Sequence, residues 1–259
     1  MPLQTNGGEM FWIKFCSVLI LAFIWSGCTA LTDVADSLPN FKMFEIGATE
    51  YEIDMSRSDI SALEKELAMN IYPMDTQLTS LLRTLSVRDT YPPLLWKQKV
   101  ISEFFWLNQI TVLDKDQKVI SRYPETSIKQ LSYDPAFPEA LSLSQGKIML
   151  AIEDTELGSE VLIISSVFHN FELTGFIVAT FDPRTFISQS NKPEDIILIS
   201  AEEIVWTGKF EQLESHLERI QWEEMVSRRI SGKVKLDQKH FFWFARGVGE
   251  DWLIYLIKE

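Results

Sequence analysis

The chain has 259 residues, of which 46% are hydrophobic and 24% charged, a composition that supports a folded core and excludes a disordered chain. Its 24 Lys and Arg against 37 Asp and Glu give a net charge of −13, which disfavours nucleic acid as a partner. The two cysteines, Cys16 and Cys28, both lie near the N-terminus. The rest of the sequence therefore offers no disulfide, no thiol nucleophile and no Cys-based zinc site.

Residues 1–27 are predicted to form a signal peptide. Residues 15–25 are an uncharged apolar run with the length of a signal-peptide core, too short to span a bilayer. The run ends in Ser26-Gly27-Cys28-Thr29, which resembles the lipobox of bacterial lipoproteins, where the cysteine receives lipid and becomes the mature N-terminus. The resemblance implies a lipid anchor at Cys28 and a location on the periplasmic side of a bacterial membrane.

Several alternatives stay open for this N-terminal region. Thr29 follows the cysteine at a position where some lipoproteins carry Asp. The absence of Asp there favours the outer membrane as the location. Cys28 could instead be incidental to an ordinary cleaved signal or to an uncleaved anchor. A start at Met10, in place of Met1, would give a short basic leader.

Residues 28–51 are predicted to be a tether, and residues 52–93 to contain a long amphipathic helix. Apolar residues recur every three or four positions from Ile60 to Leu85, which places them on one helical face. Pro73 is expected to kink this helix. Two consecutive prolines at 92 and 93 end the pattern, and a second helix is predicted over residues 94–107.

After Asn108 the periodicity becomes that of β-strands. The pattern predicts a hairpin and then three strands, the second of them a near-continuous apolar run suited to a buried central position: residues 109–113, 118–123, 147–152, 160–168 and 173–181. A smaller second module is predicted to follow, with a hairpin at 195–200 and 204–207, a helix at 210–229, and closing strands at 240–245 and 252–257. This order of helices and strands indicates the α+β class.

Several short motifs occur in a characteristic order: ITVLDKDQKVISRYP (110–124), EDTELGSEVLIISS (153–166), ELTGFIVATFDP (172–183), IILISAEEIVWTG (196–208) and DWLIYLIKE (251–259). Together they resemble double Cache sensor domains, the extracytoplasmic ligand-binding modules of many bacterial chemoreceptors and histidine kinases. The resemblance implies an α+β fold in which a long N-terminal helix precedes two PAS-like antiparallel-sheet modules. The membrane-distal module would comprise residues 94–190 and the smaller membrane-proximal module residues 191–259.

The resemblance also implies a small-molecule site over the sheet of the distal module. Asp154 matches the turn Asp of amine-recognising members, but Ile152 stands where they carry Tyr and no Arg-x-Trp-Tyr motif accompanies Tyr133. The ligand is therefore not identified as an α-amino acid, which needs a cationic clamp as well as an anion. The residues predicted to bind the ligand are Trp106, Arg122, Tyr123, Tyr133, Asp154 and Ser165, with core packing as the alternative for Trp106.

No catalytic or metal-binding constellation is predicted. The S-x-x-K at residues 144–147 lacks the partner motifs of penicillin-binding proteins, and the histidines His169, His216 and His240 are isolated. The chain is expected to be no enzyme and to need neither metal nor cofactor. The leading hypothesis is a lipid-anchored Cache-like domain that binds a small molecule for sensing and relays occupancy to a membrane-bound signalling protein. The alternative is a non-catalytic envelope lipoprotein that binds protein without a small ligand.

Overall fold

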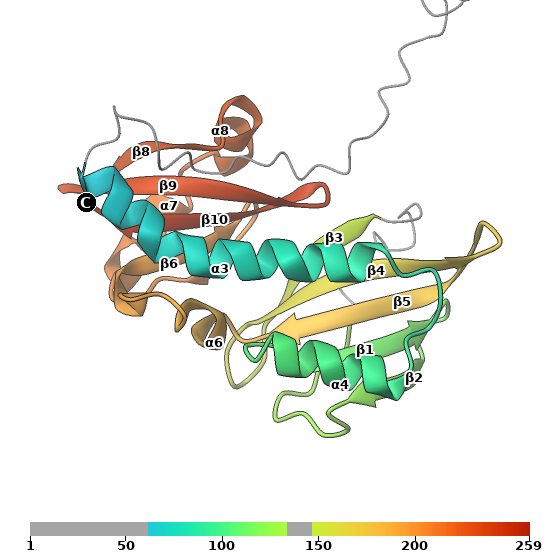
Figure 1. Ribbon diagram of the computed structural model, residues 1–259. Coiled ribbons are helices and arrows are strands. Elements are labelled where there is room, and N and C mark those ends of the chain that lie inside the picture. The colour runs from blue at the N-terminus through green and yellow to red at the C-terminus, as the bar shows by residue number, and fades with distance from the viewer. Residues whose placement is uncertain (1–61, 134–146) are drawn as a thin grey trace, which may run out of the picture. The chain divides into compact units, whose positions relative to one another are not determined.

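The computed structural model describes residues 62–133 and 147–259 (Figure 1). The predicted signal peptide, Cys28, the tether and Ser144 lie outside the described residues. No helix of the described part is long and apolar enough to cross a membrane.

Helix α3 (Ala62–Ser86) forms as the spacing of its apolar residues predicts. Its inward positions are fully buried: Ile71, Met74, Leu78, Leu81 and Leu85. Pro73 lies inside the helix, and Figure 1 shows a bend in the N-terminal half of α3, the half that contains this proline. The bend agrees with the expected loss of one backbone hydrogen bond.

Helix α4 (Leu94–Glu103) begins after the two prolines but ends four residues before the predicted boundary at 107. Phe104, Trp106 and Leu107 are all buried, and a continuous helix would not point three such closely spaced side chains into one core. The chain instead turns through a hydrogen bond from the Leu107 amide to the Phe104 carbonyl, at 2.9 Å.

The first sheet has five antiparallel strands in the spatial order β2-β1-β5-β4-β3. The predicted strands are confirmed, with ends shifted by at most one residue: β1 (Gln109–Asp114), β2 (Val119–Tyr123), β3 (Ile148–Glu153), β4 (Glu160–His169) and β5 (Glu172–Phe181). Strand β4 is buried and interior, as its apolar run predicts, but the central position expected for it is taken by β5. Residues Asn170 and Phe171 form the tight β4–β5 turn with φ of 51° and 67°.

The second sheet has the same order, β7-β6-β10-β9-β8. Helix α6 (Pro183–Ile187) and the short η2 (Pro193–Asp195) lead into it, and its strands are β6 (Ile196–Ser200), β7 (Ile204–Trp206), β8 (Ser231–Leu236), β9 (Lys239–Val248) and β10 (Asp251–Lys258). Strand β8 was not predicted, because its sequence SGKVKL is polar and only Leu236 is buried, as suits an exposed edge. The second module is therefore shorter in residues but equal to the first in strands.

The predicted helix over 210–229 is wrong, because the segment is broken into η3 (Glu211–Leu213), α7 (Glu214–Leu217) and α8 (Trp222–Arg228). Leu217 and Trp222 are both buried in the second module's core. A spacing of five residues does not keep two side chains on one face of a continuous helix. The break between α7 and α8 lets both point inward, and the Trp222 indole N–H donates to the Leu217 carbonyl at 3.1 Å.

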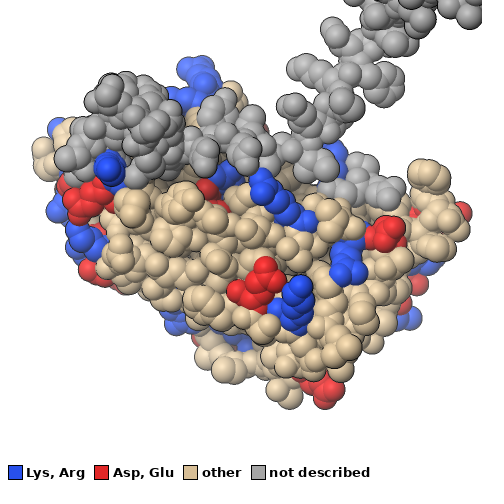
Figure 2. All heavy atoms as spheres, in the orientation of Figure 1, with Lys and Arg blue, Asp and Glu red and all other residues tan. Residues whose placement is uncertain are grey.

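The largest hydrophobic cluster joins α3, α4 and α6 with strands of both sheets. The acidic net charge is not gathered on the face that carries α3 and α4: in Figure 2 uncharged residues cover most of it and charged ones are scattered. Large apolar side chains are exposed on both helices, among them Met69, Tyr72, Leu94 and Leu95.

Candidate functional site

The sheet of the distal module has two differently packed faces. One face packs with α3 in the largest cluster and includes Val161 and Ile163 of β4. The opposite face, which we call the Tyr133 face, carries a separate cluster of Leu113, Tyr133, Met149, Leu162, Ile164, Phe176 and Val178. The alternation of strand side chains sends neighbouring residues of β4 to these opposite faces.

Polar groups are set into the apolar floor of the Tyr133 face. Thr111, fully buried on β1, has its hydroxyl 3.1 Å from the Tyr133 hydroxyl and 3.2 Å from the Gln109 side-chain oxygen. The Gln109 amide nitrogen donates to the Pro124 carbonyl at 2.7 Å. Burial raises the pKa of the Tyr133 phenol, so this hydroxyl stays protonated and can both donate and accept.

The segment that carries Tyr133, residues 129–133, is held by strand β3, and we call it the covering segment. The Glu153 carboxylate accepts hydrogen bonds from the backbone amides of Ser132 and Tyr133, at 2.6 and 3.1 Å. Tyr133 has a positive φ of 63°, which costs a non-glycine residue energy unless its surroundings hold it there. The carboxylate therefore fixes a strained turn above the sheet.

A buried charge network fixes the other end of this segment. The Lys129 ammonium lies 2.8 Å from the Asp182 carboxylate, 3.0 Å from the Glu160 carboxylate and 2.7 Å from the Ser159 carbonyl. Side-chain exposure is 7% for Lys129, 1% for Glu160 and 10% for Asp182, so water screens these charges little. One carbonyl and two carboxylates thus surround the ammonium, which makes the network a structural anchor.

The anchoring carboxylate is strongly acidic. Burial alone would raise the pKa of Asp182, but hydrogen bonds from Arg184 and Lys129 outweigh it and hold the pKa at about 2. Arg184 donates to Asp182 through its backbone amide at 2.8 Å and through its guanidinium Nε at 2.9 Å. Asp182 is also the N-cap of α6, where a negative charge is favourable.

We expect this carboxylate to make the fold acid-sensitive. Its pKa is depressed on folding, so its stabilisation is present above about pH 4 and is lost as the pH falls toward 2, amounting to about 2 kcal/mol. Between pH 5 and pH 2.5, the unfolding free energy of the wild type should fall by about that much more than that of Asp182→Asn. Asp237→Asn, at an exposed turn, is the matched control for removal of one carboxylate. Parallel pH profiles for wild type and Asp182→Asn would contradict the assignment.

The structure brings together only two of the predicted ligand-binding residues. Arg122 pairs with Thr111 across β2 and β1, so it lies on the Tyr133 face, at the exposed sheet edge. Tyr123 pairs with Ile110, whose side chain belongs to the cluster that packs with α3. Arg122 and Tyr133 therefore share a face, and Tyr123 lies on the other.

The remaining predicted residues lie elsewhere. Trp106 is buried in an aromatic cluster, with ring centroids 4.9 Å from Phe181 and 4.8 Å from Phe186. Ser165 is buried on the α3 side, where its hydroxyl donates to the Leu85 carbonyl at 3.3 Å. Asp154 is exposed in the β3–β4 turn and accepts a hydrogen bond from the Ser159 hydroxyl at 2.7 Å.

Sequence reasoning missed Thr111, Gln109, Glu153 and the Lys129 network. Thr111 and Gln109 left a signal, because two polar residues alternate with Ile110 and Val112 in a strand that is otherwise apolar. Lys129 left none, since a lysine between two predicted strands is ordinarily exposed.

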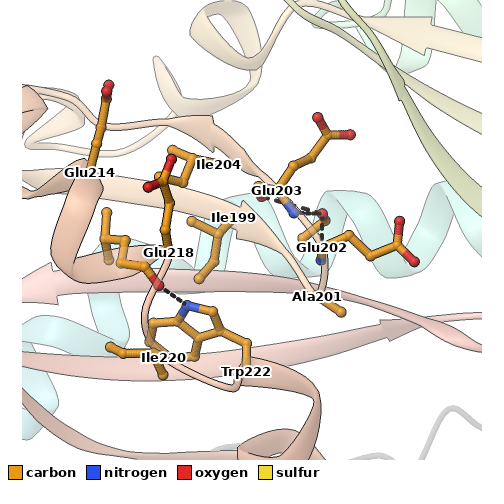
Figure 3. A pocket seen from close by; sticks show the side chains of 11 residues that line it. Ile199, Ala201, Glu202, Glu203, Ile204, Glu214, Glu218, Ile220 and Trp222 are labelled. Atoms are coloured by element: carbon orange, nitrogen blue, oxygen red, sulfur yellow. Dashed lines mark hydrogen bonds between the residues drawn. The ribbon is translucent and has the colours of Figure 1, made fainter.

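A hollow lies in the proximal module, between the β6–β7 turn and the α7–α8 connection, with a volume of about 380 Å³. Figure 3 shows the carboxylates of Glu203, Glu214 and Glu218 on one side and the Trp222 indole on the other. Burial, then the nearby charges of Asp154 and Glu202, raises the pKa of Glu203. Such a hollow repels anions. Among the described residues, none of its four glutamates (the three named and Glu202) has a salt-bridge partner.

Metal chemistry finds no support in the part of the chain that the structure describes. No three His, Cys, Asp or Glu side chains there are grouped so that they could hold a metal ion. The three histidines lie far apart in the fold, at the end of β4, in α7 and at the start of β9.

No protein-family model matches the chain, and no curated protein matches it. Among solved structures, it is similar to an extracellular ligand-binding receptor from Desulfohalobium retbaense, at 13% identity and a TM-score of 0.48 over 74% of this chain. The match spans 38% of that receptor's length.

Two chemoreceptor domains match at 13% identity and a TM-score of 0.47. One is the ligand-binding domain of the Pseudomonas aeruginosa amino-acid chemoreceptor PctC in complex with GABA, covering 76% of this chain and 97% of that one. The other is the ligand-binding domain of the Pseudomonas fluorescens chemoreceptor CtaA in complex with L-leucine, covering 74% and 93%. One long helix followed by two five-stranded antiparallel sheets of the same strand order places the chain in the α+β class.

Proposed function

We propose that this protein is an extracytoplasmic sensor domain that binds a small molecule on the Tyr133 face of its distal module. The observation that carries the proposal is the placement of Thr111, Gln109 and the Tyr133 hydroxyl within an apolar sheet face, beneath a segment anchored at both ends. Ligand pockets combine apolar walls with a few placed polar groups. Arg122, at the sheet edge, adds a cation beside them and forms no salt bridge within residues 62–133 and 147–259.

The site residues divide into two roles in this proposal. Thr111, Arg122 and Tyr133 contact the ligand, while Glu153 and Lys129 hold the covering segment in place. Trp106 and Ser165 support the sheet from the α3 side. Binding would favour one arrangement of the two modules over another, which requires different ligand affinities in the two states.

We further propose that lipid on Cys28 anchors the protein and that a membrane-bound signalling protein receives the signal. The support is the apolar run that ends in Ser26-Gly27-Cys28-Thr29. Mass spectrometry of the mature N-terminus tests the anchor. Acylated Cys28 supports it, and a free N-terminus at any other residue contradicts it.

A thermal-unfolding screen of the full-length chain tests ligand binding. Amino acids, organic acids, amines, purines and sugars are added in turn, and a ligand at 100 times its dissociation constant should stabilise the folded state by about 2.7 kcal/mol. Tyr133→Phe, which removes only the hydroxyl, should weaken the response. Tyr72→Phe on the exposed face of α3 should not, which makes it the matched control.

A screen without a response would favour the alternative of a protein-binding envelope module. That alternative has its own support in a groove of about 550 Å³ between α4 and the edge strand β2, lined in part by Leu94, Val119 and Ile120. These three side chains are 53%, 40% and 50% exposed, so an apolar surface is available there.

A further inference from the structure

The tip of the β9–β10 hairpin in the proximal module is seated on the edge strand β3 of the distal module (Figure 1). Three successive residues of the tip make the contact. Gly249 abuts the Ile148 carbonyl, the Glu250 carboxylate pairs with the Lys147 ammonium, and Asp251 accepts a hydrogen bond from the Leu150 amide at 3.0 Å. The carboxylate of Asp251 thus satisfies a backbone donor that an edge strand would otherwise leave open.

The contact depends on a glycine at position 249. A Cβ built there would lie 1.7 Å from the Ile148 carbonyl oxygen, and the residue has a φ of +69°. Any side chain would therefore push the hairpin off β3. The positive φ would strain the backbone of a non-glycine residue in addition. Gly247, two residues earlier, differs sharply, because a Cβ there would meet only the Trp252 ring at 3.7 Å or more.

Strand β3 also holds the segment over the Tyr133 face. Glu153, at the end of β3, binds the amides of Ser132 and Tyr133, while Met149 and Ala151 of the same strand pack in the cluster beneath them. The proximal hairpin thus contacts one edge of β3. The Glu153 carboxylate and the Met149 and Ala151 side chains of the same strand support the covering segment.

We propose that the β9–β10 hairpin tip is a clamp on β3 that keeps the segment carrying Tyr133 closed over the distal sheet. If the ligand site is where we place it, which rests on the proposed function, the clamp makes the proximal module a regulator of that site. Coupling is reciprocal, so ligand binding under the segment and seating of the hairpin favour each other by the same factor.

Hydrogen–deuterium exchange on the full-length chain, without any ligand, tests the clamp. Gly249→Ala should speed exchange about tenfold or more in two places, the β3 amides around Leu150 and the amides of Ser132 and Tyr133. Gly247→Ala, the matched control, should leave both at the wild-type rate. The central strands β5 and β10 should stay protected in each variant, which shows that both sheets remain folded.

Asp251→Ala provides a second route, because it removes the acceptor for the Leu150 amide without a backbone clash. It should speed exchange in the same two places, and it decides the matter if Gly249→Ala does not fold. Faster exchange confined to β3 would overturn the proposal, since the hairpin would then not control the covering segment. Unchanged exchange in β3 would overturn it as well. Neither result depends on a ligand, so failure of the clamp is distinguishable from failure of the sensor function.

Discussion

Replacing Lys129 with Met should lower the free energy of unfolding by about 3–5 kcal/mol, because two buried carboxylates lose their shared cation. The Glu160 carboxylate is 1% exposed, and among the residues that the structure describes it retains only the Asn108 side-chain amide, at 2.7 Å. Asp182 keeps Arg184 but loses the bond from Lys129. Urea denaturation of the full-length chain measures the loss, and it should exceed that of nearly every surface substitution.

Two further variants make this test specific. Lys99→Met, on the exposed side of α4, removes the same charge without touching the network and should change stability by less than about 0.5 kcal/mol. Adding Glu160→Gln to Lys129→Met should recover part of the loss, because a neutral amide costs less to bury than an unpaired carboxylate. A loss below about 1 kcal/mol in Lys129→Met would mean that the ammonium is not essential to the anchor.

The second large effect is expected at the ion pair between α3 and β9. The Arg246 guanidinium binds the Asp75 carboxylate through both Nε, at 2.5 Å, and Nη2, with side-chain exposures of 14% and 15%. Replacing Arg246 with Ala should cost about 3 kcal/mol, because Asp75 is left largely buried without a cation. The Tyr255 hydroxyl cannot replace the lost cation, since burial, then the charge of Asp75, keeps its pKa well above the ordinary value and the group stays neutral.

A double-mutant cycle with Asp75→Ala and Arg246→Ala isolates this interaction. We expect a coupling energy of about 1.5–3 kcal/mol from chemical denaturation. The surface pair of Glu224 and Arg228, with 52% and 74% exposure, is the matched control and should give less than about 1 kcal/mol. Equal coupling in the two cycles would contradict a structural role for the Asp75–Arg246 pair.

The elements that sequence reasoning placed correctly are those with a regular apolar pattern. Helix α3 and the interior strands β1, β4 and β5 bury one face or both, and burial leaves a period of 3.6 or 2, or a continuous apolar run. Strand β8 escaped because an edge strand needs few apolar residues. The α7–α8 segment was misassigned because its highly charged sequence is typical of an exposed helix. The break in it depends on tertiary packing, which buries both Leu217 and Trp222.

The site was harder to predict than the fold. Arg122 and Tyr133 are eleven residues apart, and strand pairing together with the course of the following loop places them on one face. Trp106 and Ser165 were grouped with them because nothing in the sequence showed on which side of the sheet they lie. The Lys129 anchor joins positions 129, 160 and 182, whose proximity depends on the packing of the covering segment against β4 and β5.

The shared strand order has a consequence for how the chain folds. In each sheet the last strand to be synthesised, β5 or β10, is the middle one, and it joins two hairpins that otherwise have no contact within the sheet. An isolated hairpin is marginally stable in water, so neither sheet is stable before its final strand has inserted. The insertion pairs β1 with β5 and β6 with β10 across roughly fifty to seventy residues, and such distant pairing slows folding. Each module should therefore assemble in one late, cooperative step, the distal module first as the chain is made.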